Sequence, residues 1–451
     1  MIILSYFLLA VAIFTFIIIW KKDNNLSFVI SPFLIFSVYD LMGVYTCIHA
    51  YQNGLCDSLI PFWVYLSSFF AFSISYYLHK HSIQLRHSSI VVYKNREFED
   101  NDYDRYYIPL IFLMICLVGV GLFLYKGIPL SIKNMLSLFK GDLSYSDAVS
   151  LTEYRRAMTK SYYFGGSYTG SGLLRYVLRY GWEFVDVMGL VILVKDKKHR
   201  QRNRITFFVG IILSYIFVTG DGTRVNIFRV FLAVIVAFTL LKKVKMGTAI
   251  KIGVLAMALL IVVSSVSLKI YSEEWNIATI KQAANSIIDR TVSGNQINDV
   301  YVIDWYEKGI MEHYYGQQHW IQIVNSLPGA SSYKSFSYVI SQVYGANSST
   351  TYMTPTYLSI LYADFGFLGT ILGYYAIGFV IPFIENYIYR KKKNCFWFTV
   401  ASILIMDIGL LIMTGLVKII PELVVIVFIC LLYKFFMDFR LRLSGRKPID
   451  E

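Results

Sequence analysis

The sequence has little charge and few residues of the kinds that build metal sites. Only 16% of its 451 residues are charged and 56% are hydrophobic, whereas about a quarter of a soluble domain is charged. This composition excludes an ordinary soluble protein and is typical of an integral membrane protein. The five cysteines and seven histidines form no CxxC pair, no HExxH motif and no histidine cluster. We therefore expect no metal and no cofactor.

The cysteines are too few for a disulfide framework. Cys116, Cys395 and Cys430 fall in apolar runs, where cysteine acts as a small hydrophobic side chain. Cys47 and Cys56 flank a short loop, and they could form one disulfide in an oxidising compartment.

A net charge of +13 does not indicate a nucleic-acid partner here. The basic residues stand in short stretches between apolar segments and not on one polar domain. Membrane proteins place lysine and arginine in this way to set their orientation. We therefore expect a membrane partner and no nucleic acid.

Long apolar runs predict an all-α polytopic membrane protein in which residues 1–451 form a single integral membrane domain. Crossing a bilayer takes roughly 20 apolar residues in a helix, and by that rule we count about eleven spans. The first run lacks the basic start and the small-residue cleavage site of a signal peptide, so we interpret it as a span. The predicted spans are 1–20, 27–49, 59–78, 107–125, 174–194, 205–220, 225–241, 251–269, 357–386, 396–415 and 419–436.

The basic stretches predict which loops face the cytoplasm. All of them fall on one side if the N-terminus is outside and the C-terminus is inside. The stretches are 21–22, 195–204, 242–245, 390–393 and the basic tail from Arg440. This arrangement leaves two large loops outside, 126–173 and 270–356, and places 79–106 inside as a solvated linker.

Aromatic residues are frequent in the two external loops. Among them are Tyr162, Tyr163, Tyr168, Trp275, Trp305, Tyr314, Tyr315 and Trp320. Such rings can pack on the apolar C–H faces of sugars, or they can form the aromatic belt at a membrane surface. The second loop mixes apolar and polar residues too closely for disorder, so we expect a folded, partly helical cap.

Charges within one predicted span share a helical face. Arg175, Arg179, Glu183 and Asp186 are four, four and three residues apart, which places them in one row. Because a charge facing lipid is costly, this face must look into the protein or into a wet cavity. We consider two interpretations, an arginine–glutamate ladder that fixes helix packing and a polar cavity for an anionic ligand.

More arginines are predicted near the outer surface of the membrane, level with Arg175 and Arg179. In the stretch FVTGDGTRVNIFRV, Arg224 begins a span and Arg229 lies deeper in it, while Asp221 either caps that helix or takes part in chemistry. The external loops add Arg155, Arg156 and Arg290. Clustered guanidinium groups suit phosphate, because each can hold two oxyanion atoms at once.

In its layout the chain resembles the bacterial oligosaccharide repeat-unit polymerases, the Wzy-type O-antigen polymerases. The resemblance covers nearly the whole chain by architecture and rests locally on three features. These are GDGTRVN at 220–226, LPG at 327–329 followed by TPTYLSILYADFGFLG at 354–369, and Arg155 with Gly166 eleven residues later. The second external loop has no clean copy of that last pattern starting from Arg290.

The resemblance implies a fold similar to that of the C-type membrane glycosyltransferases, and an activity. Such enzymes transfer a growing glycan from undecaprenyl pyrophosphate to the terminal sugar of a fresh lipid-linked repeat unit. Preorganised arginines can stabilise the charge on the leaving pyrophosphate without a metal, and a general base can activate the acceptor hydroxyl. We expect phosphate or glycan contacts from Arg224, Arg290, Arg175, Arg179, Arg155, Arg156 and Arg229. The candidates for the base are Asp304, Glu307, His313, His319 and Asp221.

The family resemblance also implies partners and a location. The expected partners are undecaprenyl-pyrophosphate-linked oligosaccharides and membrane lipids, and a chain-length regulator protein is a further candidate. The expected location is the bacterial inner membrane, with the active site facing the periplasm. Two alternatives stay open, an O-antigen ligase and a polysaccharide exporter or flippase. An exporter needs a polar path to the cytoplasmic side, whereas the charges within the predicted spans are concentrated toward the outside, with Asp407 and Glu385 as exceptions.

Overall fold

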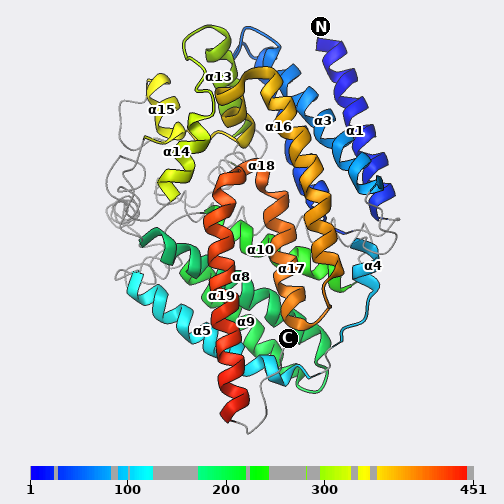
Figure 1. Cartoon of the computed structure of the whole chain (residues 1–451), viewed down its shortest axis with the longest axis vertical. Coiled ribbons are helices and arrows are strands. Elements are labelled where there is room, and N and C mark those ends of the chain that lie inside the picture. Colours follow the sequence, from blue (N-terminus) through cyan, green and yellow to red (C-terminus); the bar gives the residue numbers. More distant parts are fainter. Residues whose placement is uncertain are drawn as a thin grey trace.

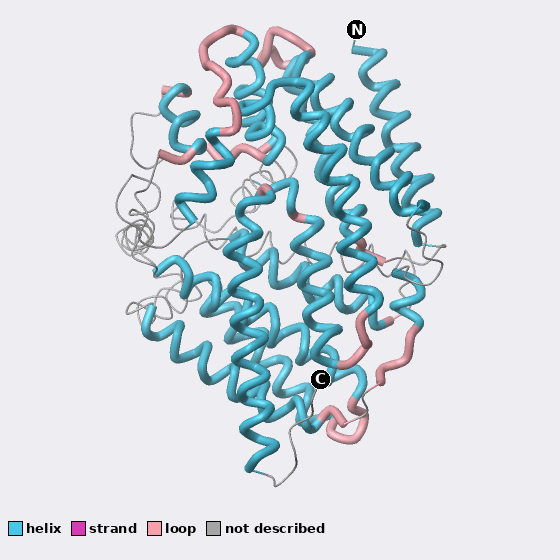
Figure 2. Tube along the Cα trace, in the orientation of Figure 1, coloured by secondary structure: helices cyan, strands magenta, loops and turns pink. Residues whose placement is uncertain are grey.

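The structure is a computed structural model of the whole chain, and its described part is entirely helical (Figures 1 and 2). It describes residues 2–24, 29–82, 90–99, 102–124, 171–219, 224–242, 281, 295–326, 334–345 and 353–443. Within these ranges there are fifteen helices and no strand. They are α1 (Ile2–Asn24), α2 (Pro32–Gln52), α3 (Ile60–Ser82), α4 (Ile90–Asn95), α5 (Asp104–Leu124), α8 (Ser171–Lys195), α9 (Arg200–Thr219), α10 (Arg224–Leu241), α13 (Gln296–Glu307), α14 (Gln317–Ser326), α15 (Phe336–Val343), α16 (Tyr357–Arg390), α17 (Cys395–Gly409), α18 (Leu411–Thr414) and α19 (Leu416–Leu443).

The apolar helices confirm a multi-span membrane protein. Four of them, α1, α2, α5 and α16, are long and apolar enough to cross a membrane. Two shorter apolar helices, Phe228–Leu241 within α10 and α17, add to these. Helices also occupy the positions of the spans predicted on α3, α8, α9 and α19, and their crossing of the membrane stays a prediction. The predicted span 251–269 lies outside the described residues.

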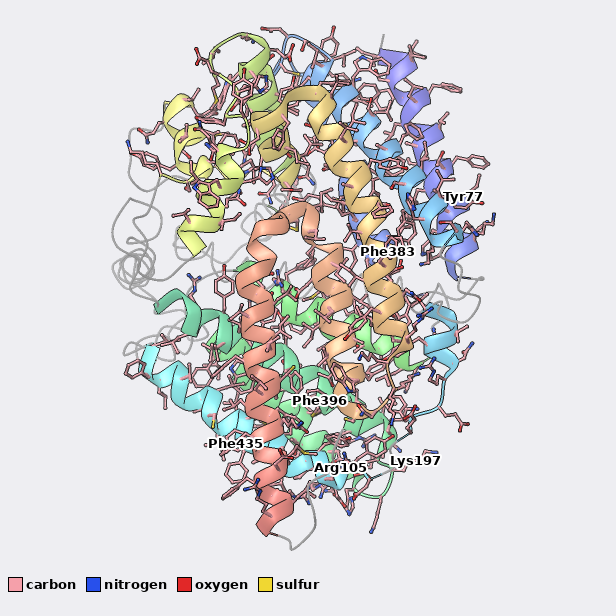
Figure 3. The ribbon with its side chains drawn as sticks, viewed as in Figure 1. Tyr77, Arg105, Lys197, Phe383, Phe396 and Phe435 are labelled. Atoms are coloured by element: carbon pink, nitrogen blue, oxygen red, sulfur yellow. The ribbon has the colours of Figure 1, made fainter. Side chains whose placement is uncertain are left out.

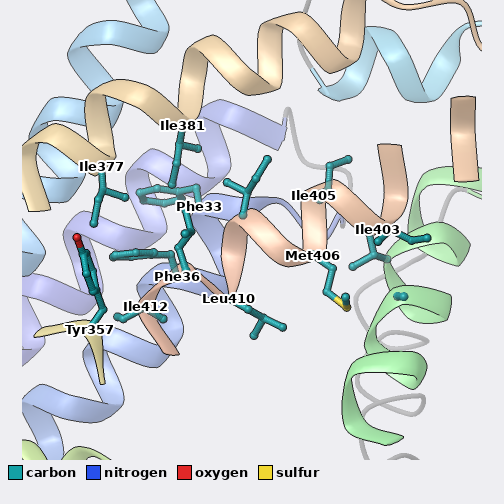
Figure 4. Packing of buried hydrophobic residues seen from close by; sticks show 14 of the residues in the cluster. Phe33, Phe36, Tyr357, Ile377, Ile381, Ile403, Ile405, Met406, Leu410 and Ile412 are labelled. Carbon is teal, nitrogen blue, oxygen red and sulfur yellow. The ribbon is translucent and has the colours of Figure 1, made fainter. Parts of the chain in front are cut away.

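The helices pack in two groups that α17 joins. In one group α16 packs along α3, and α2 lies against α1 and α3. In the other, α8 is central and contacts α5, α9, α10 and α19. Because α17 contacts α2 as well as α8 and α10, it links the two groups. Figure 4 shows buried apolar side chains at this junction, with Phe33 and Phe36 of α2 beside Ile377 of α16, and Met406 of α17 farther along toward α10.

The helices α13, α14 and α15 gather at the end of the molecule where α16 begins (Figure 1). They belong to the segment 270–356, and we call the described part of this segment the cap. α16 is not one continuous helix, because Gly366 has φ +65° and ψ −163°. A positive φ of this kind is readily adopted only by glycine. Because of this break, the part of α16 before Gly366, which carries Tyr357 and Asp364, runs in a different direction from the rest of the helix and lies beside the cap.

Three of the stretches predicted to face the cytoplasm, 195–204, 390–393 and the tail from Arg440, meet at the other end of the molecule. Arg202 of α9 pairs with Asp104 of α5 at 2.7 Å, and Arg440 of α19 donates to the Asp104 carbonyl. Arg96 donates to the Lys391 carbonyl at 2.9 Å. Figure 3 shows Arg105 and Lys197 at this same end. These three stretches therefore lie together, and the side of the membrane that they face stays a prediction.

The prediction of a solvated linker at 79–106 is wrong for its described central part. Ile90 and Tyr93 of α4 are buried. The Lys393 amine is buried as well and donates to the Lys94 and Arg96 carbonyls at 2.7 and 2.9 Å. Its charge lies 5.1 Å from the centre of the Phe98 ring, an attractive cation–π contact. These contacts of Lys393 with two backbone carbonyls and an aromatic ring thus hold residues 90–99 against the bundle.

The possible disulfide is not formed. Cys47 and Cys56 are both free thiols, and both are buried. Burial raises the pKa of the Cys56 thiol to about 11, so this thiol stays protonated and unreactive at neutral pH.

Candidate functional site

A cluster of buried charges lies where α8, α10 and α19 of the second group meet α17. Arg179 and Glu183 come from α8, Arg229 from α10, Asp407 from α17 and Glu422 from α19. All but Arg179 are fully buried, and the Arg179 side chain is 13% exposed. The apolar runs of four helices therefore bring together charges that are distant in the sequence.

Each arginine in the cluster has carboxylate partners. Arg229 donates to Asp407 and lies 3.6 Å from Glu183. It also donates to the Tyr180 hydroxyl at 2.9 Å. Arg179 donates to Glu422 at 3.0 Å.

The charge balance of this cluster favours a structural role for Arg179 and Arg229. Two guanidinium groups face three carboxylates, so the cluster carries no spare positive charge when every group is ionised. A buried ion pair is maintained only when both partners are satisfied. This matches the ladder interpretation of the row on α8, extended to α10, α17 and α19. Asp186, which was predicted in the same row, faces α9 instead, where a methyl group at Gly210 would lie 3.2 Å from its carboxylate.

For the other predicted site residues, the structure gives a position on a helix or no description. Arg175 lies one turn before Arg179 on α8 and is half-buried. Arg224 is the first residue of α10, at the position predicted for it. Arg155, Arg156, Arg290 and Asp221 lie outside the described residues.

A second polar cluster joins the cap to the start of α16. His319 of α14 contacts the Asp364 carboxylate through Nδ1 and the Tyr357 hydroxyl through Nε2, the latter at 3.0 Å. Asp364 is fully buried, and it also accepts the backbone N–H groups of Gln318 and His319 at 3.0 and 3.1 Å. A carboxylate at a helix N-terminus is favoured by the unpaired N–H groups there. Asp364 therefore caps α14 and orients the His319 ring at the same time.

This arrangement gives His319 the geometry of a general base. A carboxylate that accepts Nδ1–H fixes the tautomer, which leaves Nε2 as the proton acceptor. The His319 side chain is 19% exposed, whereas Asp364 is not exposed at all. A hydroxyl group that replaces Tyr357 at Nε2 can therefore lose its proton to His319.

The other predicted bases are engaged differently. Asp304 pairs with Lys308 at 2.6 Å, and Lys308 pairs in turn with Asp57 at 2.7 Å. These two carboxylates raise the pKa of the Lys308 amine. Glu307 accepts the Tyr362 hydroxyl. His313 contacts the Ala363 carbonyl at 3.3 Å through Nδ1. Among the candidates within the described residues, only His319 therefore lies against a carboxylate.

Sequence reasoning missed several polar residues that build these clusters. Glu422 had a signal, since it is a lone carboxylate within the predicted span 419–436. Asp364 stands in the quoted stretch ADFGFLG but was given no role there. Asp299 of α13 was missed as well, although it accepts the Tyr65 and Ser359 hydroxyls and the Thr356 N–H.

Asp299 ties the cap to the first helix group. Its hydrogen-bond partners come from α3, α16 and the residue before α16. Burial raises the pKa of its carboxyl to about 6, and the three donors limit that rise. Asn295, one turn earlier, donates to the Tyr39 hydroxyl of α2 at 3.1 Å.

The two polar clusters are connected through α19. α14, which carries His319, packs against α19 and α16. α19 packs in turn against α8, which carries Arg179, and its own Glu422 binds that arginine. In Figure 1 the beginning of α19 lies between α14 and α8.

One group of described residues has the composition of a metal site. It shares no residue with either polar cluster. The ligand atoms of Asp104, Asp196 and His199 lie within 4.8 Å of one another. Arg202 lies 2.7 Å from Asp104 and 3.5 Å from Asp196, and it supplies the positive charge that a metal would bring. We therefore interpret this group as an ion-pair network that joins α5 to the turn before α9.

Comparison with known proteins identifies a family. The model of the family described as "Putative O-antigen polymerase" matches residues 171–430, which is more than half of the chain. The matched region includes both polar clusters. No curated protein and no solved structure matches the chain.

Proposed function

The chain belongs to the O-antigen polymerase family, and from that membership we propose that it joins lipid-linked oligosaccharide repeat units into a surface polysaccharide. The family match over residues 171–430 is the observation that carries this proposal. It agrees with a multi-span helical protein, because a substrate with a lipid anchor must be handled at a membrane. We place the reaction at the periplasmic face of the bacterial inner membrane.

In the proposed reaction a growing glycan leaves its undecaprenyl pyrophosphate. The bond between the anomeric carbon and the pyrophosphate oxygen breaks, and the bonding electrons stay with the pyrophosphate. A hydroxyl oxygen on the terminal sugar of a second lipid-linked repeat unit forms the new bond to that carbon. The hydroxyl proton passes to a base on the protein. No oxidation or reduction takes place.

We assign the base role to His319. Its Nε2 is the acceptor nitrogen when Asp364 holds Nδ1–H, and a neutral imidazole held in this way can take a proton from a hydroxyl group within hydrogen-bond reach. The acceptor hydroxyl would take the place of the Tyr357 hydroxyl, which lies 3.0 Å from Nε2. Asp364 is then a positioning residue, since it acts through His319.

We assign pyrophosphate binding to five of the arginines that the sequence predicts at the outer level. These are Arg175, Arg224 and Arg290, together with Arg155 and Arg156 of the first external loop. Arginine suits this task because its planar fork binds phosphate oxygens in pairs. Arg179 and Arg229 are already bound to carboxylates, so we propose that they hold α8, α10, α17 and α19 in place beneath the substrate.

A gel of surface glycan from a deletion strain tests the function. Lipopolysaccharide with a single repeat unit in the deletion strain supports a polymerase, and a long ladder should return with the intact gene. Unsubstituted core in the deletion strain would contradict the proposal, because a ligase or a flippase gives that result.

The same gel tests the assignment of His319. We expect His319→Ala to leave single-repeat lipopolysaccharide although the protein is inserted at normal amounts. His313→Ala is the matched control, since His313 lies in the same cap and contacts only a backbone carbonyl through Nδ1. It should give a normal ladder. A normal ladder from His319→Ala would overturn the assignment.

A further inference from the structure

Three aromatic side chains of the cap lie together on its surface. Tyr301 and Trp305 are one turn apart on α13, and their rings stack with centroids 6.1 Å apart and planes 15° apart. Tyr344, just after α15, brings a third ring, 5.6 Å from Tyr301 and 6.3 Å from Trp305. We call these three residues the aromatic platform.

The aromatic platform is not part of the apolar core. Tyr344 is 57% exposed, and Tyr301 and Trp305 are half-buried. On α13 the fully buried side chains are others, such as Val300 and Ile303. Because Tyr301 and Trp305 are held by each other and by Tyr344, their orientation is fixed before anything binds, which lowers the entropy lost on binding.

Charged groups border the platform. Lys308 follows Trp305 by three residues and lies on the same side of α13. It pairs with Asp57 at 2.7 Å, and the side chains are 41% and 78% exposed. The surface therefore combines flat rings with exposed donors and acceptors.

This combination fits a sugar ring. The axial C–H groups of a pyranose form an apolar, slightly positive face, and the face of an aromatic ring is negative. The hydroxyl groups at the sugar's edge then need hydrogen-bond partners such as Lys308 and Asp57. A lipid tail would leave this ion pair without water, which is unfavourable, and so lipid is the poorer occupant.

We propose that the aromatic platform binds a sugar residue of the growing glycan and holds the chain between additions. The proposal rests on the proposed function, since a chain must be growing for the platform to hold it. The platform is a second site, separate from His319: it contains no residue to which we assign a step of the transfer. Its loss should therefore shorten the polymer without abolishing the first additions.

Binding of lipid-free glycan tests the platform directly. The probe is polysaccharide released by mild acid from the surface of the host strain, titrated onto the purified full chain in nanodiscs by calorimetry. We expect Trp305→Ala and Tyr344→Ala to bind about tenfold more weakly, which corresponds to about 1.4 kcal/mol. Trp305→Phe should keep most of the affinity. Tyr387→Ala is the matched control, because Tyr387 is 61% exposed and lies beside Lys391 at the end of α16 that is remote from the cap.

Chain length in cells is the second measurement. We expect Trp305→Ala and Tyr344→Ala to give ladders with fewer repeats but with more than one. Unchanged affinity and unchanged chain length in both variants would overturn the proposal. Tyr344→Ala alone decides the matter if Trp305→Ala does not fold, since Tyr344 is mostly exposed. Failure of the intact chain to restore any ladder would instead overturn the proposed function.

Discussion

At the scale of single residues, Asp364 has two tasks that a substitution can separate. It caps α14 and it fixes the His319 ring. We expect Asp364→Asn to lower the elongation rate by about 100-fold or more, because the amide favours the wrong tautomer of the histidine. The double variant with His319→Ala should be no slower than His319→Ala alone, since residues that act as a unit are not additive. Elongation of a lipid-linked substrate by the purified variants measures this, and additive losses would contradict it.

We predict that the stabilisation that Asp299 gives to the attachment of the cap depends on pH. Its folded pKa of about 6 exceeds the ordinary value of 3.8 for the unfolded chain. The folded state therefore favours the protonated form, so this stabilisation is complete below about pH 4 and is lost as the pH rises through 6. A difference of about two pKa units corresponds to on the order of 3 kcal/mol.

Thermal unfolding between pH 4 and 7 checks this sign. The stability of the intact chain relative to Asp299→Asn should fall as the pH rises over that interval, because asparagine has no proton to lose. A constant difference across the interval, or one that grows with pH, would show that Asp299 is not the titrating group.

At the scale of elements, the buried charge cluster holds four helices together. Removing one partner leaves an uncompensated charge inside the protein, which costs about 3–5 kcal/mol. We expect Arg229→Met to destabilise the protein by that order and to reduce the inserted amount. Arg202→Met is the control, because Arg202 is 35% exposed and such surface pairs contribute about 1 kcal/mol or less. Equal melting temperatures for the two variants would contradict this role.

The elements differ in how far the sequence could predict them. Hydropathy located the helices well, because a helix that crosses lipid must be apolar along its length. It did not predict the break in α16 at Gly366, where a single glycine is the only signal. It also failed for α4, since the buried place of Lys393 depends on carbonyl groups and rings from distant segments.

The candidate site shows the same limit. The row of charges on α8 was visible in the sequence from its helical spacing, and His319 was one of five candidate bases. Their partners Asp364, Asp407 and Glu422 could not be assigned, because pairing depends on which helices face one another. Spacing within one helix is local information, whereas the pairing of α8 with α10, α17 and α19 is not.

At the scale of the whole molecule, the contacts sort the loops into two groups. The basic stretches near Asp104 and Lys391 meet at one end, while the cap contacts the loop between α2 and α3 at the other. We expect Tyr315→Cys, in a cysteine-free background, to be labelled from outside the cell. Lys197→Cys should be labelled only after the membrane is opened. Labelling of Lys197→Cys in intact cells would reverse the orientation.

The central claim is that the chain transfers a glycan between lipid-linked repeat units with His319 as the base. The most direct measurement is the purified chain in proteoliposomes, supplied with one lipid-linked repeat unit and followed by the appearance of products with two or more repeats. The account predicts such products from the intact chain and from His313→Ala, and a rate at least about 100-fold lower from His319→Ala. Equal rates from the intact chain and His319→Ala would contradict it.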